Sequence, residues 1–243
     1  MKIFINTMTL GEKYNKPFNQ VEMIKELIAN GYKNIEVRRD FITRIAQEIF
    51  EISELARENK VTIYYSVQDT LYKNFTLNKN AINQYIDEAR ILGAESIKFS
   101  IGTYAGYNKG DNEYIKDVLN TGIKIYVEND KSFENGRIDK LTRFLKDSKT
   151  YGNNIRASFD IGNWLWAGEE PESCSEILKE YVDYVHLKDV KIVDGKYCIT
   201  KLGDGIVNWR YFNDLFKGND IGLNYPCGIN PIETIKEEIK KIS

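Results

Sequence analysis

The sequence predicts a (β/α)8 barrel of parallel strands, and three observations lead to that fold class. Short runs rich in β-branched residues recur along the chain, segments with helical spacing of apolar residues lie between them, and 243 residues suffice for eight such pairs. Successive strands start roughly 26 to 40 residues apart, which is typical of βα units and not of an antiparallel meander. Because α/β barrels of about 250 residues form one unit, we expect a single domain over residues 1–243.

Eight runs have the length and composition of strands. They are KIFIN from Lys2, NIEVR from Asn34, VTIYYSV from Val61, SIKFSI from Ser96, IKIYVE from Ile123, IRASFD from Ile155, YVDYVHLK from Tyr181 and IGLNY from Ile221.

Helical patterns follow these strands, several with an end signal such as the Asn-Gly pair at residues 30–31 or Gly93. The expected helices cover residues 18–29, 41–58, 78–92, 139–145, 172–180, 209–216 and 231–242, with a shorter stretch near residues 113–119.

A doubly wound open sheet is the second fold that this alternation allows. Such a sheet usually has GxGxxG or GxxxxGK[ST] after its first strand, and neither motif occurs there. No linker rich in Pro, Gly or Ser divides the chain. The barrel is therefore favoured.

Composition excludes several classes of protein. With 34 Lys and Arg against 36 Asp and Glu, the chain has no excess of positive charge for binding nucleic acid. No run of 18 apolar residues and no secretory leader occurs, so we expect a soluble, cytoplasmic protein without a membrane partner. Cys174, Cys198 and Cys227 lack CxxC spacing and are expected to be reduced thiols. The single histidine excludes any site that needs two imidazoles.

Polar and apolar residues alternate within the strands, although buried parallel strands are usually continuous apolar runs. In the fifth strand residues 123, 125 and 127 are apolar, while Lys124, Tyr126 and Glu128 share the other face. The apolar face should contact the helices, which leaves the polar face in the lumen. The inward residues predicted in this way are Asn6, Glu36, Arg38, Ser66, Gln68, Lys98, Ser100, Glu128, Asp160, His186, Lys188 and Asn224.

Four consecutive strands, the fifth to the eighth, end in polar side chains that should form one arc at the mouth of the barrel. These are Glu128, Asp160, His186 and Asn224. The carboxyl ends of barrel strands are where barrel enzymes have their active sites. Two carboxylates and an imidazole suit a divalent cation such as Mn, Co, Zn or Mg, with open positions for substrate oxygens.

The segments IYVEND, SFDIGNWLWAGEEP and YVHLKD, each at a strand end, resemble the metal-binding segments of the sugar phosphate isomerase/epimerase family. These are xylose isomerase-like TIM barrels, related also to endonuclease IV. IEVRRD and GDGIVNW match the family as well, and the resemblance covers essentially the whole chain. It implies that Glu128, Asp160 and His186 are metal ligands.

The chain departs from the family at the fourth ligand. The family usually has a Glu followed by an aromatic residue and Pro on strand eight, where this chain has Leu-Asn-Tyr-Pro at residues 223–226. Asn224 offers an oxygen without charge, so a weak or lost metal is expected. A neutral amide takes no proton, so two-base epimerisation is disfavoured and one-base aldose–ketose isomerisation through Glu128 is left.

Lys98 and Lys188 point inward beside the carboxylates and are candidate catalytic residues. An ammonium near Glu128 or Asp160 can replace a metal cation, form an ion pair, or, with a lowered pKa, form a Schiff base.

Five further side chains are candidate substrate contacts. Glu36, Arg38 and Gln68 can bond sugar hydroxyls, with an internal ion pair as the alternative for Glu36 and Arg38. Trp164 and Trp166 can stack on a sugar face or close the top of the barrel.

The loop at residues 201–205 lies where barrels often bind phosphate, although its Gly content is a weak signal. Asp189, on the outer face, is expected to be structural.

The leading functional hypothesis is a metal-dependent isomerase that forms an enediolate from a small sugar, polyol or sugar phosphate. One alternative is a catalytically degenerate barrel that binds a carbohydrate-like ligand, and another is a lyase or dehydratase. Endonuclease chemistry ranks last because it requires several histidines. The expected partner is a small molecule, and homo-oligomerisation is left open.

Overall fold

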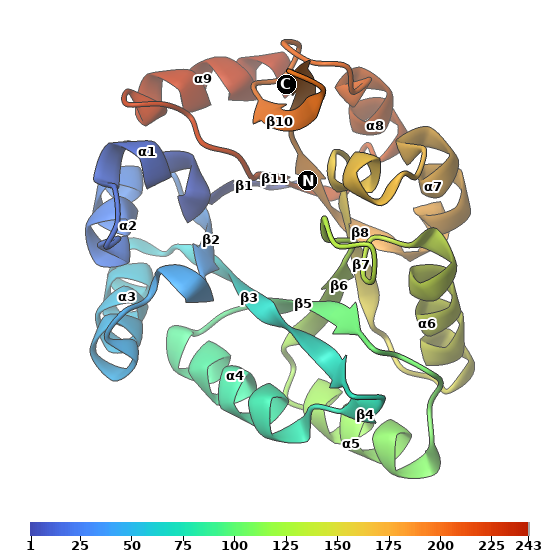
Figure 1. Cartoon of the computed structure of the whole chain (residues 1–243). Helices are drawn as coiled ribbons and strands as arrows, with labels where there is room; N and C mark the ends of the chain where they lie inside the picture. The colour runs from blue at the N-terminus through green and yellow to red at the C-terminus, as the bar shows by residue number, and fades with distance from the viewer. Residues whose placement is uncertain (243) are drawn as a thin grey trace.

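The structure, a computed structural model, describes residues 1–242 and confirms the predicted barrel (Figure 1). Within these residues eight parallel strands pair in a ring, which closes through β2 and β3. All eight correspond to predicted strands. They are β1 (Ile3–Asn6), β2 (Asn34–Arg38), β3 (Thr62–Lys73), β5 (Ser96–Gly102), β6 (Lys124–Glu128), β7 (Arg156–Asp160), β8 (Val182–Leu187) and β11 (Asp220–Leu223).

Helices form the outer ring that Figure 1 shows around the strands. The α-helices are α1 (Gly11–Tyr14), α2 (Gln20–Ala29), α3 (Ile45–Asn59), α4 (Lys79–Leu92), α5 (Lys109–Leu119), α6 (Ile138–Thr150), α7 (Pro171–Leu178), α8 (Trp209–Leu215) and α9 (Pro231–Ile242). Short 3-10 helices are η1 (Thr7–Leu10), η2 (Arg39–Phe41), η3 (Asn163–Ala167) and η4 (Lys179–Tyr181). In the chain as described, no helix combines the length and apolarity needed to cross a membrane.

Local hydrogen bonds explain where helix bounds differ from the prediction. α3 starts four residues later than expected, because Glu48 Oε1 accepts from the backbone amides of Thr43 and Arg44 at 3.1 and 2.8 Å and caps the helix there. α5 starts earlier than expected, because Asn108 accepts from the amide of Asp111 at 2.9 Å. α6 continues to Thr150, five residues beyond its predicted end.

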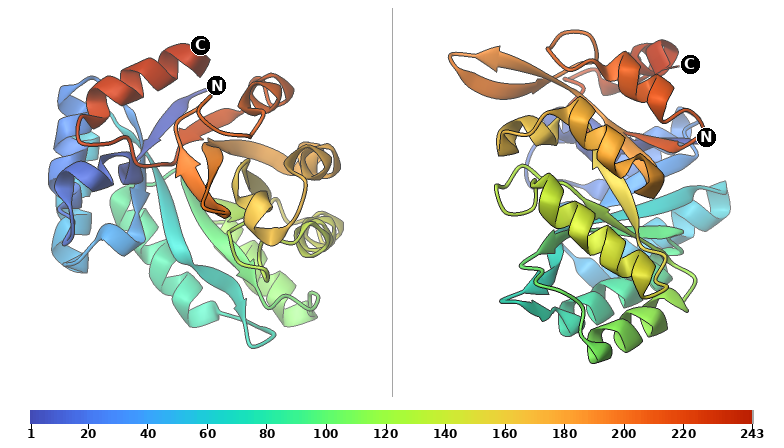
Figure 2. Two further views of the ribbon diagram at one scale, coloured as in Figure 1. Left: turned by 45° about the horizontal axis from the view of Figure 1, so that its top comes forward. Right: turned by 90° about the vertical axis from the view of Figure 1, so that its right-hand side faces the viewer.

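The hairpin of β9 (Asp189–Val193) and β10 (Lys196–Thr200) follows β8 directly and was not predicted. In the right-hand view of Figure 2 this hairpin, in orange, projects beyond the barrel. Its turn is Asp194-Gly195, with φ of 50° and 73°. An Asp-Gly pair between β-branched runs is a strong hairpin signal, so the sequence contains the information. β3 is also longer than expected and pairs with β4 (Thr76–Leu77).

Inward-facing and outward-facing residues alternate along each strand, and the inward-facing residues form two different layers in the lumen. An aromatic layer consists of Phe4, Tyr64, Tyr126 and Tyr184, all buried and in contact with one another. Toward the carboxyl ends of the strands, an ionic layer consists of Glu36, Lys98, Glu128, Asp160, His186 and Lys188. The predicted assignment of polar residues to the lumen is therefore confirmed for the ionic layer.

Candidate functional site

A cavity of about 450 Å³ opens at the carboxyl ends of the barrel strands, a size that suits a small ligand. Six of the predicted site residues line it: Arg38, Gln68, Lys98, Glu128, Lys188 and Asn224. Glu36, Asp160 and His186 do not line it; they are buried and contact residues that do.

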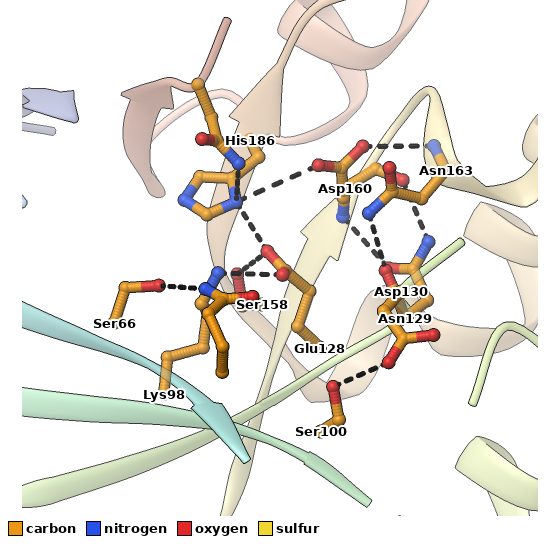
Figure 3. Close-up of polar contacts among 12 residues, drawn as sticks. Ser66, Lys98, Ser100, Glu128, Asn129, Asp130, Ser158, Asp160, Asn163 and His186 are labelled. Carbon is orange, nitrogen blue, oxygen red and sulfur yellow. Dashed lines mark hydrogen bonds and ion pairs between the residues drawn. The ribbon is translucent and has the colours of Figure 1, made fainter. Parts of the chain in front are cut away.

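Both ring nitrogens of His186 face carboxylates in the ionic layer, and Figure 3 shows the contacts of one of them with Glu128 and Asp160. Nδ1 lies 2.5 Å from Glu128 Oε1, and Nε2 lies 2.7 Å from Glu36 Oε2. Burial alone would lower the pKa of His186, but the two carboxylates outweigh it and raise this pKa to about 9. Gly222 on β11 leaves room for the ring, since a Cβ there would lie 2.6 Å from His186 Cδ2. The geometry thus favours a charged imidazolium.

Lys98, on β5, contacts two carboxylates, Glu128 on the adjacent strand β6 and Glu36 on β2 across the lumen. Its Nζ lies 2.7 Å from Glu128 Oε2 and 3.7 Å from Glu36 Oε1. Burial would lower the pKa of Lys98, yet Glu128 and Glu36 raise it. Burial would likewise raise the pKa of Glu128, but Lys98 and His186 lower it to about 2. The ion-pair alternative for Lys98 fits this geometry, and a neutral amine for a Schiff base does not.

Asp160 ends β7 and is fixed on one side by backbone amides. Its Oδ1 accepts from the amides of Gly162 and Asn163 at 3.1 and 3.0 Å, the first turn after the strand. Its Oδ2 lies 2.6 Å from Lys188 Nζ, which also donates to Asn163 Oδ1 at 2.9 Å. Lys188 is therefore also in an ion pair.

Glu128, Asp160 and His186 each place a ligand atom within 4.8 Å of the others, so this group can hold a metal ion. The donor types fit a divalent cation such as Zn or Mn. A cation must compete here with two ammonium groups, and the layer is already balanced: three carboxylates face two lysines and an imidazolium. Metal binding would therefore require His186 to lose its proton.

Asn224 reaches this group from the residue after β11. Its Nδ2 lies 3.2 Å from His186 Nδ1, and it lines the cavity. The structure thus places its amide nitrogen beside His186, and its role as a fourth metal ligand stays a prediction. The amide adds no charge there.

Arg38 and Gln68 line the cavity, and their role as substrate contacts stays a prediction. Arg38 donates to both oxygens of Asp40 at 3.0 and 2.8 Å, and its guanidinium lies 5.0 Å from the Phe41 ring centroid. Gln68 lies where the β3–β5 register shifts between Ser66 and Thr70. Glu36, by contrast, is held by Tyr184, His186 and Lys98, so its internal ion pair replaces the predicted substrate contact.

The two tryptophans of η3 have different surroundings. Trp164 is completely buried and packs on Phe159 at 5.4 Å between ring centroids, so its prediction as a substrate contact is wrong and it belongs to the core. Trp166 is only partly buried and lies between Lys131, at 4.2 Å, and Tyr197 of the hairpin, at 5.5 Å. Its role as a substrate contact stays a prediction.

The loop at residues 201–205 does not offer free amides to a phosphate. Asp189 Oδ2 accepts from the amides of Gly203 and Gly205 at 2.9 and 3.0 Å, and its Oδ1 accepts from Val207 at 3.0 Å. A Cβ on Gly205 would collide with Asp189 Oδ1, so glycine is needed. Asp189 is structural, as expected, and the hypothesis of a phosphate site in this loop is wrong.

Several residues that shape the site were not predicted from the sequence. Asn129 holds Asp160 by exchanging two hydrogen bonds with its backbone, at 3.0 and 2.9 Å. Tyr184 donates to Glu36 Oε2 at 2.7 Å. Asn129 lies within the IYVEND segment, and Tyr184 is two residues before His186, so the same motifs and period could have identified them. Lys131, which lines the cavity from a loop, had no such signal.

Comparison with known proteins agrees with this architecture. A sequence model of the xylose isomerase-like TIM barrel family matches residues 24–243. No curated protein sequence matches significantly.

Solved structures match across nearly the full length of both chains. A xylose isomerase domain protein from Salmonella typhimurium shares 13% identity over 99% of this chain and 97% of its own, with a TM-score of 0.73. The zinc-bound IolI protein shares 14% over 100% and 98%, with a TM-score of 0.71. The probable 3-DHS dehydratase AsbF from Bacillus anthracis shares 14% over 99% and 98%, with a TM-score of 0.68. At such identities these similarities support the fold alone.

Proposed function

The chain belongs to the xylose isomerase-like TIM barrel family, and from that premise we propose that it is an enzyme of isomerase type. Its substrate would be a small sugar, polyol or sugar phosphate that binds in the cavity at the mouth of the barrel. The observation that supports this most is the position of Glu128. Its carboxylate lines the cavity while Lys98 and His186 fix its two oxygens.

Glu128 is the proposed base. Lys98 and His186 lower its pKa to about 2, so the carboxylate is ionised at neutral pH. Because a general base works best with a pKa near the working pH, proton abstraction from a carbon next to a carbonyl requires that the bound substrate loosen these two ion pairs. No carboxylate occupies the position of Asn224 after β11, so one base would remove and return the proton on the same face of the substrate. That arrangement favours aldose–ketose isomerisation over two-base epimerisation.

Lys98 and Lys188 would stabilise the negative charge that develops on the substrate oxygens. Both ammonium groups line the cavity, and both are fixed by carboxylates at the ends of barrel strands. Preorganised donors of this kind act strongly because they need no reorientation during the reaction.

A divalent cation, Mn, Co, Zn or Mg, would be held by Glu128, Asp160 and His186, with the amide oxygen of Asn224 as a weak fourth ligand. When bound, it would supply Lewis-acid stabilisation of adjacent hydroxyl and carbonyl oxygens. Competition with Lys98 and Lys188 predicts weak binding. A metal-free barrel that only binds its ligand is the second candidate, and the closed charge balance of the ionic layer favours it.

Hydrogen exchange tests the proposal across a range of candidate substrates. A panel of aldoses, ketoses and their phosphates is incubated with the protein in D₂O, with and without Mn²⁺, and NMR detects loss of the C–H signal next to the carbonyl. We expect exchange and isomerisation of at least one compound, and a fall of about 1000-fold or more in Glu128→Gln.

Tyr126→Phe is the matched control, since it removes one oxygen from the aromatic layer beneath the same site; it should keep exchange within about threefold of the native rate. Ligand binding without exchange in the native protein would instead support the binding-only barrel.

A further inference from the structure

Four cations line the cavity, and three of them face a carboxylate. The pairs are Arg38 with Asp40 at 2.8 Å, Lys98 with Glu128 at 2.7 Å, and Lys188 with Asp160 at 2.6 Å. The fourth cation is Lys131, in the loop between β6 and α6. Among residues 1–242 no carboxylate lies within ion-pair distance of its ammonium, which instead lies 4.2 Å from the centroid of Trp166.

The neighbouring Asp130 is not available as a partner for Lys131. Its Oδ1 accepts from both the amide and the hydroxyl of Ser132, and its Oδ2 accepts from Ser100 and Asn135, each at 2.8 Å. These bonds instead fix the backbone on either side of Lys131. The lysine is therefore held at the cavity by a rigid loop.

The same loop packs closely against η3, which holds Trp166. A Cβ at Gly136 would lie 2.8 Å from Ala167 Cβ and 2.7 Å from the carbonyl oxygen of Asp130, so the two segments touch there. The Lys131 residue remains exposed in part. Partial burial of its ammonium and the nearby Lys188 ammonium lower the pKa of Lys131, while Asp160 opposes the shift. A bound anion would offset that repulsion.

We propose that Lys131 is the specificity residue for an oxyanion on the substrate, so that the ligand is a sugar acid or a sugar phosphate rather than a neutral sugar. The inference rests on the proposed function, because it places the ligand in the same cavity. Lys131 follows Glu128 by three residues, so the base at the end of β6 and the anion site in the next loop are close in sequence. The hairpin residue Ile199 also lines the cavity, and the Trp166 ring contacts the Lys131 ammonium.

Calorimetric titration with three compounds of the same carbon skeleton tests this. D-glucitol is neutral, D-gluconate carries a carboxylate, and D-glucitol 6-phosphate carries a phosphate. At constant ionic strength, we expect at least one of the two anions to bind about tenfold or more tightly than D-glucitol. The anion that binds more tightly identifies the group. Lys131→Met should remove the preference, and Lys131→Arg should retain most of it.

Lys116→Met is the matched control, since it removes an exposed lysine on α5, on the outside of the barrel, and should leave all three affinities unchanged. Equal affinities in the native protein, or an anion preference that survives in Lys131→Met, would overturn the inference. The proposed function has an independent test, because the absence of hydrogen exchange would refute it whatever the titrations show.

Discussion

The two layers of the lumen occupy the same barrel and the same strands, yet they differ completely in chemistry. Tyr64, Tyr126 and Tyr184 in the aromatic layer alternate along the strands with positions that face the helices. Two residues further along β6 and β8 stand Glu128 and His186. The aromatic layer and the ionic layer are thus separated by only two residues along each of these strands.

The difference shows where stability and function reside. Aromatic contacts stabilise the barrel through burial and ring packing. Buried ion pairs are a poor source of stability, because the cost of desolvating each ion largely cancels their attraction. The ionic layer therefore needs a functional explanation that the aromatic layer does not, and its position beside the cavity supplies one.

Removal of one charged group from the ionic layer should lower the free energy of unfolding more than removal of one hydroxyl group from the aromatic layer. Lys98→Met leaves Glu128 and Glu36 without a cation at this position and should lower the free energy of unfolding by about 3 to 5 kcal/mol. Tyr64→Phe removes one hydroxyl that donates to Asp220 and should cost about 1 to 2 kcal/mol. Urea denaturation measures both, and equal losses would contradict the contrast between the layers.

Stability of the metal-free protein should depend on pH mainly through His186 between about pH 6.5 and 9. Above about pH 8 the buried thiols of Cys174 and Cys227, whose pKa values burial raises to about 12, add to the decline. The folded pKa of His186, about 9, lies above its ordinary value of 6.5. Its contribution is therefore complete below pH 6.5 and lost as the pH rises toward 9, a decline of about 2 to 3 kcal/mol. Because the chain has a single histidine, the assignment is direct.

His186→Gln is the control for this decline. Denaturation curves recorded across the same pH range should be nearly flat up to about pH 8 in this variant. An unchanged decline would assign the effect to another group.

A substitution at Asn224 tests whether the ionic layer can bind a metal ion more tightly. Asn224→Glu adds a carboxylate next to His186 Nδ1 and should tighten Mn²⁺ binding about tenfold or more, which corresponds to about 1.4 kcal/mol. Asn224→Gln keeps a neutral amide and should stay within about threefold of the native dissociation constant. Calorimetry distinguishes these results, and no gain in Asn224→Glu would show that the position is not a ligand site.

The smallest predicted effect concerns the two tryptophans. Trp166→Ala removes the ring beside Lys131 and should weaken binding of an anionic ligand about threefold, the scale of one cation–π contact. Trp164→Phe, in the core, should lower thermal stability and leave that binding unchanged. A reversed outcome would place Trp164, not Trp166, at the ligand.

The fold and the ligand arc were predictable because both follow from period and position. Alternation along the strands identified Glu128, Asp160 and His186 as inward and terminal, and the matching motifs agreed. The roles of other residues depend on partners that are distant in sequence. Trp164 and Trp166 are two residues apart and indistinguishable by composition, yet one packs on Phe159 and the other on Lys131. Lys131 lies in a loop, where no period indicates direction.

Titration of Mn²⁺ into chelator-treated protein, at concentrations high enough to detect weak binding, tests the central claim most directly, namely that Glu128, Asp160 and His186 can together hold a divalent metal ion at the mouth of the barrel. We expect about one equivalent of bound Mn²⁺, a rise in melting temperature, and proton release as His186 loses its charge. Less than about 0.2 equivalents, with no thermal shift, would contradict the claim.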